Sequence, residues 1–177
     1  RIIKKSVEKV VLNLKVGQIP IRFSPDGINW MKQVQPEFGD TFHSKRIAAV
    51  LGLSEGDIDP RHPVEEVSTG LPCIIVPVRS MDALKRIRID REGYDELTAG
   101  RRAKLILVFC SGGYGAGQAL GVRVFPIALG IQEDPATGSG NGCLGAYLVR
   151  HRYFGSGAAD IRVGQGYEIG RPSVIHI

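Results

Sequence analysis

The stretch Glu133 to Gly142, EDPATGSGNG, places two adjacent carboxylates ahead of two hydroxyl side chains and three glycines. A mostly apolar run, CLGAYLV, follows and predicts a helix that begins near Thr137 and ends near Tyr153. The first N–H groups of a helix have no internal partners and attract anions. Because glycines let a ligand approach the backbone closely, the stretch predicts a receptor for a small carboxylate.

Asp134 lies beside this receptor, where a carboxyl group suits general acid/base catalysis. Thr137 and Ser139 either cap the helix or donate hydrogen bonds to a bound carboxylate. A structural alternative also accounts for the stretch: Asp134 or Thr137 only caps the helix, and the glycines only permit tight packing. Glu133 is expected to support the site rather than to catalyse, because adjacent side chains point apart. No Gly-Lys-Ser/Thr follows the glycines, which excludes a phosphate-binding loop.

The three cysteines, Cys73, Cys110 and Cys143, are far apart and lie in apolar surroundings. They match neither a CxxC motif nor a metal-binding Cys/His spacing. We therefore predict buried thiols in a reducing, cytoplasmic compartment, and no metal held by these cysteines. Cys143 is nearest to the glycine-rich stretch, but the sequence offers no base or positive neighbour that would make it a thiolate.

Other polar residues have two interpretations each. Thr69 and Gly70 either line a ligand cleft or form the turn before a strand. Arg171 either contacts a substrate or has a structural role, in an ion pair with Glu168 or in a turn. The four histidines share no metal-like spacing, and His176 is expected at the edge of the core.

The chain has 177 residues, of which 43% are hydrophobic, enough for one domain with a substantial core. Its net charge of +5 comes from scattered basic residues without interleaved aromatics, which predicts a solvated surface and no nucleic-acid partner. No apolar run approaches the roughly 20 residues that span a bilayer, so no membrane association is expected. The first residue is Arg1 rather than Met, so we expect that the natural chain starts earlier.

Strand patterns dominate, with three or four helices between them, which indicates an α+β domain rather than a doubly wound parallel fold. Residues 7–16 alternate in part, and Pro25-Asp26-Gly27 predicts a hairpin turn between two further strands. Residues 73–78 and 104–110 are nearly continuous apolar runs, typical of buried strands. Helices are predicted from Ser44 to Gly52 and after Ser80 as an N-cap, and residues 122–131 as a strand pair or a bent strand.

EDPATGS followed by GCLGAYL resembles the signature of the phenazine-biosynthesis PhzF-like family, relatives of diaminopimelate epimerase. Three further segments resemble that family in the same order along the chain: STGLPCIIVPV, RVFP and QGYEIGRPS. Together the matching segments span residues 60–177.

The resemblance implies a strongly curved mixed or antiparallel sheet wrapped around one long central helix, as one half of a diaminopimelate epimerase-like fold. It implies a cofactor-independent isomerase or epimerase that moves a proton on a small amino- or hydroxy-carboxylate. Asp134 would be the catalytic acid, and Ser139 with the Gly138 and Gly140 backbone would hold the substrate carboxylate. A homodimer is the implied assembly. A non-catalytic relative that binds a small ligand or another protein is the alternative.

The chain departs from the family pattern in two respects: it ends just after GRPS, where the family usually continues with further strands, and it lacks one tripeptide. The family's second acid belongs to an N-terminal half that contains Gly-His-Pro, and this tripeptide does not occur here. Arg61-His62-Pro63 carries the histidine and the proline in an unrelated context. We therefore expect residues 1–177 to be a single domain, the C-terminal half of a longer two-domain protein, and to be inactive alone.

Overall fold

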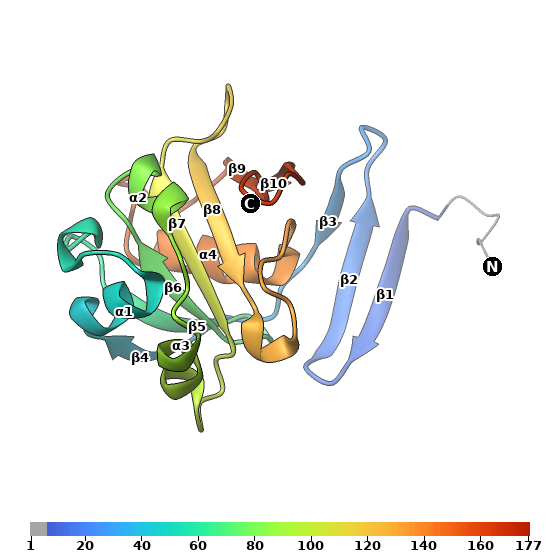
Figure 1. Cartoon of the computed structure of the whole chain (residues 1–177). Helices are drawn as coiled ribbons and strands as arrows, with labels where there is room; N and C mark the ends of the chain where they lie inside the picture. Colours follow the sequence, from blue (N-terminus) through green and yellow to red (C-terminus); the bar gives the residue numbers. More distant parts are fainter. Residues whose placement is uncertain (1–6) are drawn as a thin grey trace.

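The structure is a computed structural model that describes residues 7–177 (Figure 1). These residues form ten strands, four α-helices and two short 3-10 helices. The strands are β1 (Lys9–Leu14), β2 (Gly17–Phe23), β3 (Asn29–Met31), β4 (Glu37–Phe42), β5 (Val64–Ser68), β6 (Cys73–Pro77), β7 (Leu105–Ser111), β8 (Leu120–Phe125), β9 (Arg162–Gln165) and β10 (Ser173–His176). The helices are α1 (Ser44–Leu51), α2 (Met81–Arg86), α3 (Arg91–Thr98), α4 (Gly138–Arg150), η1 (Glu55–Asp57) and η2 (Ile127–Leu129).

Seven strands form one mixed sheet in the order β10-β9-β8-β7-β6-β5-β4. The pairs β6–β7 and β8–β9 are parallel, and the other four pairs are antiparallel. The remaining strands form a separate three-stranded antiparallel sheet, β1-β2-β3, at one side of the larger sheet (Figure 1). The α+β class with a mixed sheet is thus as predicted.

Both faces of the large sheet are covered, which explains why its central strands are apolar throughout. On β7, Ile106 and Val108 point into a core cluster shared with α1, α2 and α3, whereas Leu107 and Phe109 point into a second cluster with α4. Successive side chains of a strand face opposite sides, so a strand between two helical layers must be apolar at every position. The predicted burial of strand 73–78 is confirmed, since all five residues of β6 are buried.

The predicted architecture of one long helix inside a strongly curved sheet is wrong in two respects. Residues 7–177 contain four α-helices, three of which cover the face of the sheet opposite α4. A strongly curved sheet is not what the structure shows. The prediction failed because the helical segments near Ser44 and Ser80, although identified, carry no signal for the face on which they pack.

Predictions based on short-range sequence patterns are confirmed for a helix cap, a helix end and a hairpin turn. Ser80 caps α2 by accepting a hydrogen bond from the Ala83 N–H, and Gly52 ends α1 with a positive φ of 65°. The β2–β3 hairpin is confirmed, and Gly27 adopts a φ of +84° at its turn. These features depend on residues adjacent in sequence, which is why pattern alone predicts them.

Two elements differ from the prediction. Strand β4 was missed because Gly39 and Asp40 look like a break, and the pairing of β4 with β5 is indeed irregular between Phe38 and Thr41. Residues 122–131 were expected to be a strand pair or a bent strand. They form the end of β8 followed by η2, because Pro126 cannot donate to the sheet. Among residues 7–177, none of the helices combines the length and apolarity needed to cross a bilayer.

Candidate active site

Asp134 is fixed by its backbone and by one hydroxyl group. Its N–H donates to the Val124 carbonyl (3.0 Å), which attaches the residue to the end of β8. The half-buried carboxylate accepts a hydrogen bond from the Thr137 hydroxyl (2.5 Å). Thr137 is the N-cap residue of α4, but its side chain makes no capping bond. The alternative in which the Thr137 hydroxyl caps the helix is therefore wrong, because that hydroxyl is used by Asp134.

Gln165, at the end of β9, holds the loop between Asp134 and α4 from inside the protein. Its amide Nε2 donates to the Asp134 carbonyl (2.6 Å) and to Thr137 Oγ1 (3.0 Å). Its Oε1 accepts from the Thr137 N–H (3.4 Å) and from the Asn141 amide (2.8 Å). The side chain has no exposed surface, so these bonds are made without competition from water. Sequence reasoning missed this role, although Gln165 belongs to the QGYEIGRPS segment.

Gly166 explains why a glycine follows Gln165. Its φ is +82°, and a Cβ atom there would lie 2.9 Å from the Pro135 carbonyl oxygen and 2.3 Å from that of Arg171. Only glycine allows the loop after β9 to pass this close to the EDPATGS stretch. The two motifs are thus adjacent in space, and each depends on the other for its conformation.

The residues of the predicted anion receptor lie at the first turn of α4. The intrahelical ladder starts with the Asn141 N–H, which donates to the Thr137 carbonyl (2.9 Å). The N–H groups of Gly138, Ser139 and Gly140 precede this bond, and the first three N–H groups of a helix lack intrahelical partners. Ser139 is half-buried, whereas Gly138 is exposed. The structure thus brings all the predicted site residues into one loop and one helical turn.

The glycines of the motif have protein neighbours as well as open space. A Cβ atom at Gly142 would lie 2.7 Å from Cδ of Gln33, which comes from the segment between β3 and β4. A Cβ atom at Gly138 would lie 3.6 Å from Met31 Cε. Positions four apart lie on one face of a helix, so this face of α4 admits the segment from Met31 to Gln33. The packing interpretation therefore holds for Gly142.

A cavity of about 360 Å³ lies beside the first turn of α4. Its polar lining residues are Lys15, Gln33, Thr69 and Ser139, and it lies between the β1–β2 hairpin, the loop after β5 and the start of α4. Of the predicted site residues, Ser139 lines it and Asp134 does not. Thr69 thus lines a cavity, which was one of its two interpretations.

Cys143 lies under this cavity as a buried thiol. Its sulfur is 3.4 Å from the Thr69 hydroxyl and 3.5 Å from the Leu71 carbonyl oxygen. Burial raises the pKa of the Cys143 thiol above its ordinary value, although the Thr69 hydrogen bond acts in the opposite direction. A raised pKa disfavours the nucleophilic thiolate, so the structure supports a packing role. All three cysteines are free and buried, as predicted.

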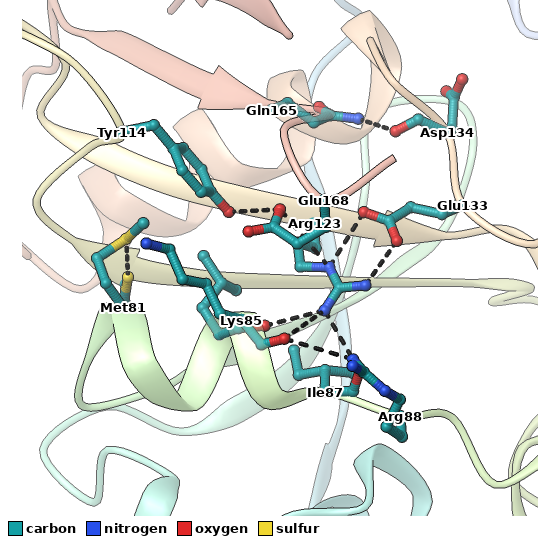
Figure 2. A network of polar contacts seen from close by, with 12 residues as sticks. Met81, Lys85, Ile87, Arg88, Tyr114, Arg123, Glu133, Asp134, Gln165 and Glu168 are labelled. Atoms are coloured by element: carbon teal, nitrogen blue, oxygen red, sulfur yellow. Dashed lines mark hydrogen bonds and ion pairs between the residues drawn. The ribbon is translucent and has the colours of Figure 1, made fainter. Parts of the chain in front are cut away.

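Glu133 faces away from Asp134 and forms a buried ion pair (Figure 2). Its carboxylate accepts two hydrogen bonds from Arg123 of β8, with Nη2–Oε2 and Nε–Oε1 distances of 2.6 and 3.1 Å. Arg123 Nη1 also donates to the carbonyls of Leu84 and Ile87, at 3.1 and 3.3 Å. The expected support role of Glu133 agrees with this geometry, and Arg123 is a residue that sequence reasoning missed.

Glu168 extends the same network towards the glycine-rich loop that precedes β8. It accepts a hydrogen bond from the Tyr114 hydroxyl (2.8 Å) and lies 3.9 Å from Arg123 Nε. Burial, and then this hydrogen bond, raise the pKa of Tyr114, so Tyr114 remains a neutral donor. The ion pair considered for Arg171 is therefore wrong, because Glu168 contacts Arg123 and Tyr114 instead.

His62 and His176 lie outside the candidate site. The His62 ring packs against Tyr153 with a centroid distance of 4.8 Å, beyond the C-terminal end of α4. Tyr147, near the C-terminal end of α4, links the helix to the segment that carries His62: its hydroxyl donates to the Pro63 carbonyl (2.6 Å). His176 packs edge-on against Trp30 (6.1 Å) and is half-buried, as expected for a residue at the edge of the core.

Comparisons with known proteins identify the family of the chain. The family model described as "Phenazine biosynthesis-like protein" matches residues 2–177. The chain is 30% identical to trans-2,3-dihydro-3-hydroxyanthranilate isomerase of Pseudomonas aeruginosa over 170 residues, which are 94% of the chain and 56% of that protein. It is 28% identical to an uncharacterised isomerase of Clostridium acetobutylicum over 152 residues, 83% of the chain and 50% of that protein.

Solved structures show the same fold. A phenazine biosynthesis protein of the PhzF family from Bacillus anthracis has a TM-score of 0.82 and 25% identity, over 97% of this chain and 60% of that one. A predicted epimerase from Pseudomonas aeruginosa has a TM-score of 0.74 and 30% identity, over 95% of this chain and 58% of that one. The chain spans about half the length of the curated relatives it matches. Since the family model covers nearly all of the sequence, the chain belongs to the phenazine biosynthesis-like, or PhzF-like, family.

Proposed function

We propose that this chain binds a small amino- or hydroxy-carboxylate and moves a proton on it, as one half of a cofactor-independent isomerase or epimerase. The observation that carries the proposal is the hydrogen bond between Asp134 and Thr137, the N-cap residue of α4. It holds a carboxyl group beside a helical turn whose N–H groups suit a bound anion. Ser139 adds a half-buried hydroxyl that lines the adjacent cavity.

In this proposal the Gly138, Ser139 and Gly140 N–H groups, with the Ser139 hydroxyl, hold the substrate carboxylate. Asp134 takes a proton from carbon or returns one, and Thr137 keeps its carboxyl group oriented through their hydrogen bond. Gln165 fixes the loop that carries both residues, through its bonds to the Asp134 carbonyl and Thr137. Proton transfer on a carboxylate-bearing carbon needs no redox group, which is why we propose no cofactor.

The second proton-transfer group, by family resemblance, belongs to an N-terminal half of the same protein. The length of the matched relatives supports this part of the proposal, because the chain covers about half of each. Residues 1–177 alone are then inactive, since the cleft lacks one of its two walls. We also propose a homodimer, which light scattering of the full-length protein tests, and a reducing, cytoplasmic location, which the three free thiols support.

The test is hydrogen exchange in deuterated water with the full-length protein and a panel of small amino- and hydroxy-carboxylates. We expect deuterium to enter one substrate at carbon, and Asp134→Asn to reduce the rate by about 100-fold or more, the usual contribution of a general acid or base. The matched control is Asp160→Asn, which changes an exposed carboxylate outside the site and should leave the rate unchanged.

Exchange that continues unchanged in Asp134→Asn, with the thermal midpoint preserved, removes Asp134 from the reaction. Carboxylates that bind to the full-length protein without any exchange support the non-catalytic alternative instead. Residues 1–177 tested alone should bind weakly and exchange nothing.

A further inference from the structure

The cavity beside Ser139 is apolar over most of its surface. Leu14 and Val16 from the β1–β2 hairpin, Ile19 of β2, Met31 of β3 and Leu71 line it. Ile19 is almost fully buried, with 4% of its surface exposed, so the hairpin closes one side of the cavity. A volume of about 360 Å³ lies within the range of small-molecule sites, roughly 300–1,000 Å³.

Besides Lys15, which is exposed, the polar lining of the same cavity consists of Gln33, Thr69 and Ser139. The Thr69 hydroxyl donates to Gln33 Oε1 (3.0 Å), and the Gln33 side chain fits over Gly142 of α4. Because Oε1 is used by Thr69, the amide NH₂ is the polar group of Gln33 that remains for a ligand. Ser139 lies on the first turn of α4 and lines the cavity together with Gln33 and Thr69.

In this cavity, two parts of a ligand would have different surroundings. A carboxylate held at the first turn of α4 lies at Ser139, and the rest of the molecule meets mainly leucine, valine, isoleucine and methionine side chains. An amide placed among these apolar side chains, away from Gln33 and the exposed Lys15, loses its water without gaining partners, which costs free energy. A hydrocarbon group placed there leaves water at no such cost.

We propose that the cavity is a specificity subsite for an apolar substituent, so that the substrate class is a monocarboxylate carrying a hydrocarbon group. The inference rests on the proposed function, since it takes the carboxylate to be bound at Ser139. It goes further by ranking substrates: a hydrocarbon group should bind in the cavity more tightly than an amide of the same shape. Gln33 is assigned as the residue that orients the substrate between the two parts.

Two achiral anions test the preference: 4-methylpentanoate and succinamate. They have the same chain length, branching and charge, and differ only in a terminal CH(CH₃)₂ or C(O)NH₂ group. Calorimetric titration of the full-length protein should show 4-methylpentanoate binding about tenfold more tightly, or about 1.4 kcal/mol. Equal affinities, tighter binding of succinamate, or no binding of either probe would overturn the subsite.

Leu14→Asn and Leu129→Asn form a matched pair of variants. Both leucines are about half exposed, at 51% and 53%, so either change should leave folding intact. Leu14 lines the cavity and Leu129, in η2, does not. We expect Leu14→Asn to reduce the preference for 4-methylpentanoate at least threefold, and Leu129→Asn to leave it unchanged. A preference that survives Leu14→Asn, or that both variants lower equally, places the apolar group elsewhere.

Failure of this inference can be told apart from failure of the proposed function. If carboxylates exchange deuterium in an Asp134-dependent way but the two probes bind equally, the reaction stands and the apolar subsite falls. If no carboxylate exchanges but the probe preference is present and depends on Leu14, the subsite stands and the proton-transfer reaction falls.

Discussion

The Gln165 side chain links three residues at the candidate site, Asp134, Thr137 and Asn141, although its residue type did not single it out in the sequence. It bonds to Asp134 through the backbone carbonyl, to Thr137 through both the N–H and the hydroxyl, and to Asn141. Asn141 in turn donates to the Thr137 carbonyl (3.0 Å). Glutamine can serve here because one amide supplies two donors and an acceptor at a fixed separation.

Gln165→Leu should therefore destabilise the protein by about 2–4 kcal/mol, because buried donors on Thr137 and Asn141 lose their acceptor at about 1–3 kcal/mol each. Urea unfolding of the variant measures the change. Gln132→Leu is the control, since Gln132 is exposed and a surface change typically stays within about 0.5 kcal/mol. Equal stability of the two variants would mean that the Gln165 bonds contribute little.

The ion pair of Arg123 and Glu133 shows why two adjacent acids have different roles. Both side chains are 7% exposed, and the pair closes against backbone carbonyls at the end of α2 (Figure 2). A buried carboxylate needs such a partner, because an unpaired buried charge is strongly destabilising. The ion pair of Glu133 thus fixes the start of the loop, whereas the Asp134 carboxylate is held by the hydrogen bond from the Thr137 hydroxyl.

At the scale of elements, α4 is shaped by what must lie against it. Gly142 makes room for Gln33, whereas a Cβ atom at Gly145 would have its nearest neighbour, Ile177 Cβ, at an ordinary contact distance of 3.9 Å. Gly138 and Gly142 share the face that meets the segment from Met31 to Gln33. The glycines on this face therefore allow the segment to pack closely against the helix.

Gly145→Ala should stabilise the protein, whereas Gly142→Ala should not. Alanine favours a helix interior by about 1 kcal/mol over glycine, which Gly145→Ala should gain. Gly142→Ala displaces Gln33 and breaks its bond to Thr69, a loss of about 1 kcal/mol or more that removes the gain. Thermal or urea unfolding of both variants measures this difference.

Adding Gln33→Ala to Gly142→Ala provides the control, because the displaced side chain is then absent. The double variant should be more stable than additivity of the two single changes predicts. Strict additivity would show that Gly142 and Gln33 are not coupled.

At the scale of the whole molecule, stability should depend on pH through His62. Burial lowers the pKa of His62 below its ordinary 6.5, partly offset by the nearby Asp59. Below pH 6.5 the unfolded chain binds a proton that the folded protein resists, so stability falls as the pH decreases towards the folded pKa. Above pH 6.5 both states are neutral at this residue and the effect disappears.

His62→Gln should flatten this part of the profile in urea unfolding measured between about pH 5 and pH 8. The variant and the parent should keep a constant difference near pH 8 and converge or cross as the pH falls. A parallel pair of curves would contradict the assignment. Asp59 acts in a lower range, because its hydrogen bond from Arg61 lowers its pKa below 3.8 and the resulting stability is lost only as the pH falls through that lowered value.

Sequence alone determined the features that depend on neighbouring residues. The turn at Gly27, the cap at Ser80, the buried strands and the helix after EDPATGS follow from spacing over a few positions. The family motifs likewise identified Asp134 and Ser139 as candidates before any contact was known. These are local or compositional signals, which a linear sequence carries in full.

Only the tertiary structure decided which segments meet. Gln165 under Asp134, Gln33 over Gly142 and Arg123 against Glu133 each join different segments of the chain. The sequence also could not predict that α1, α2 and α3 pack on the face of the sheet opposite α4. An apolar helical face indicates that the helix is partly buried, but not against which side of a sheet it packs. Such contacts are set by strand order and packing, which no local pattern records.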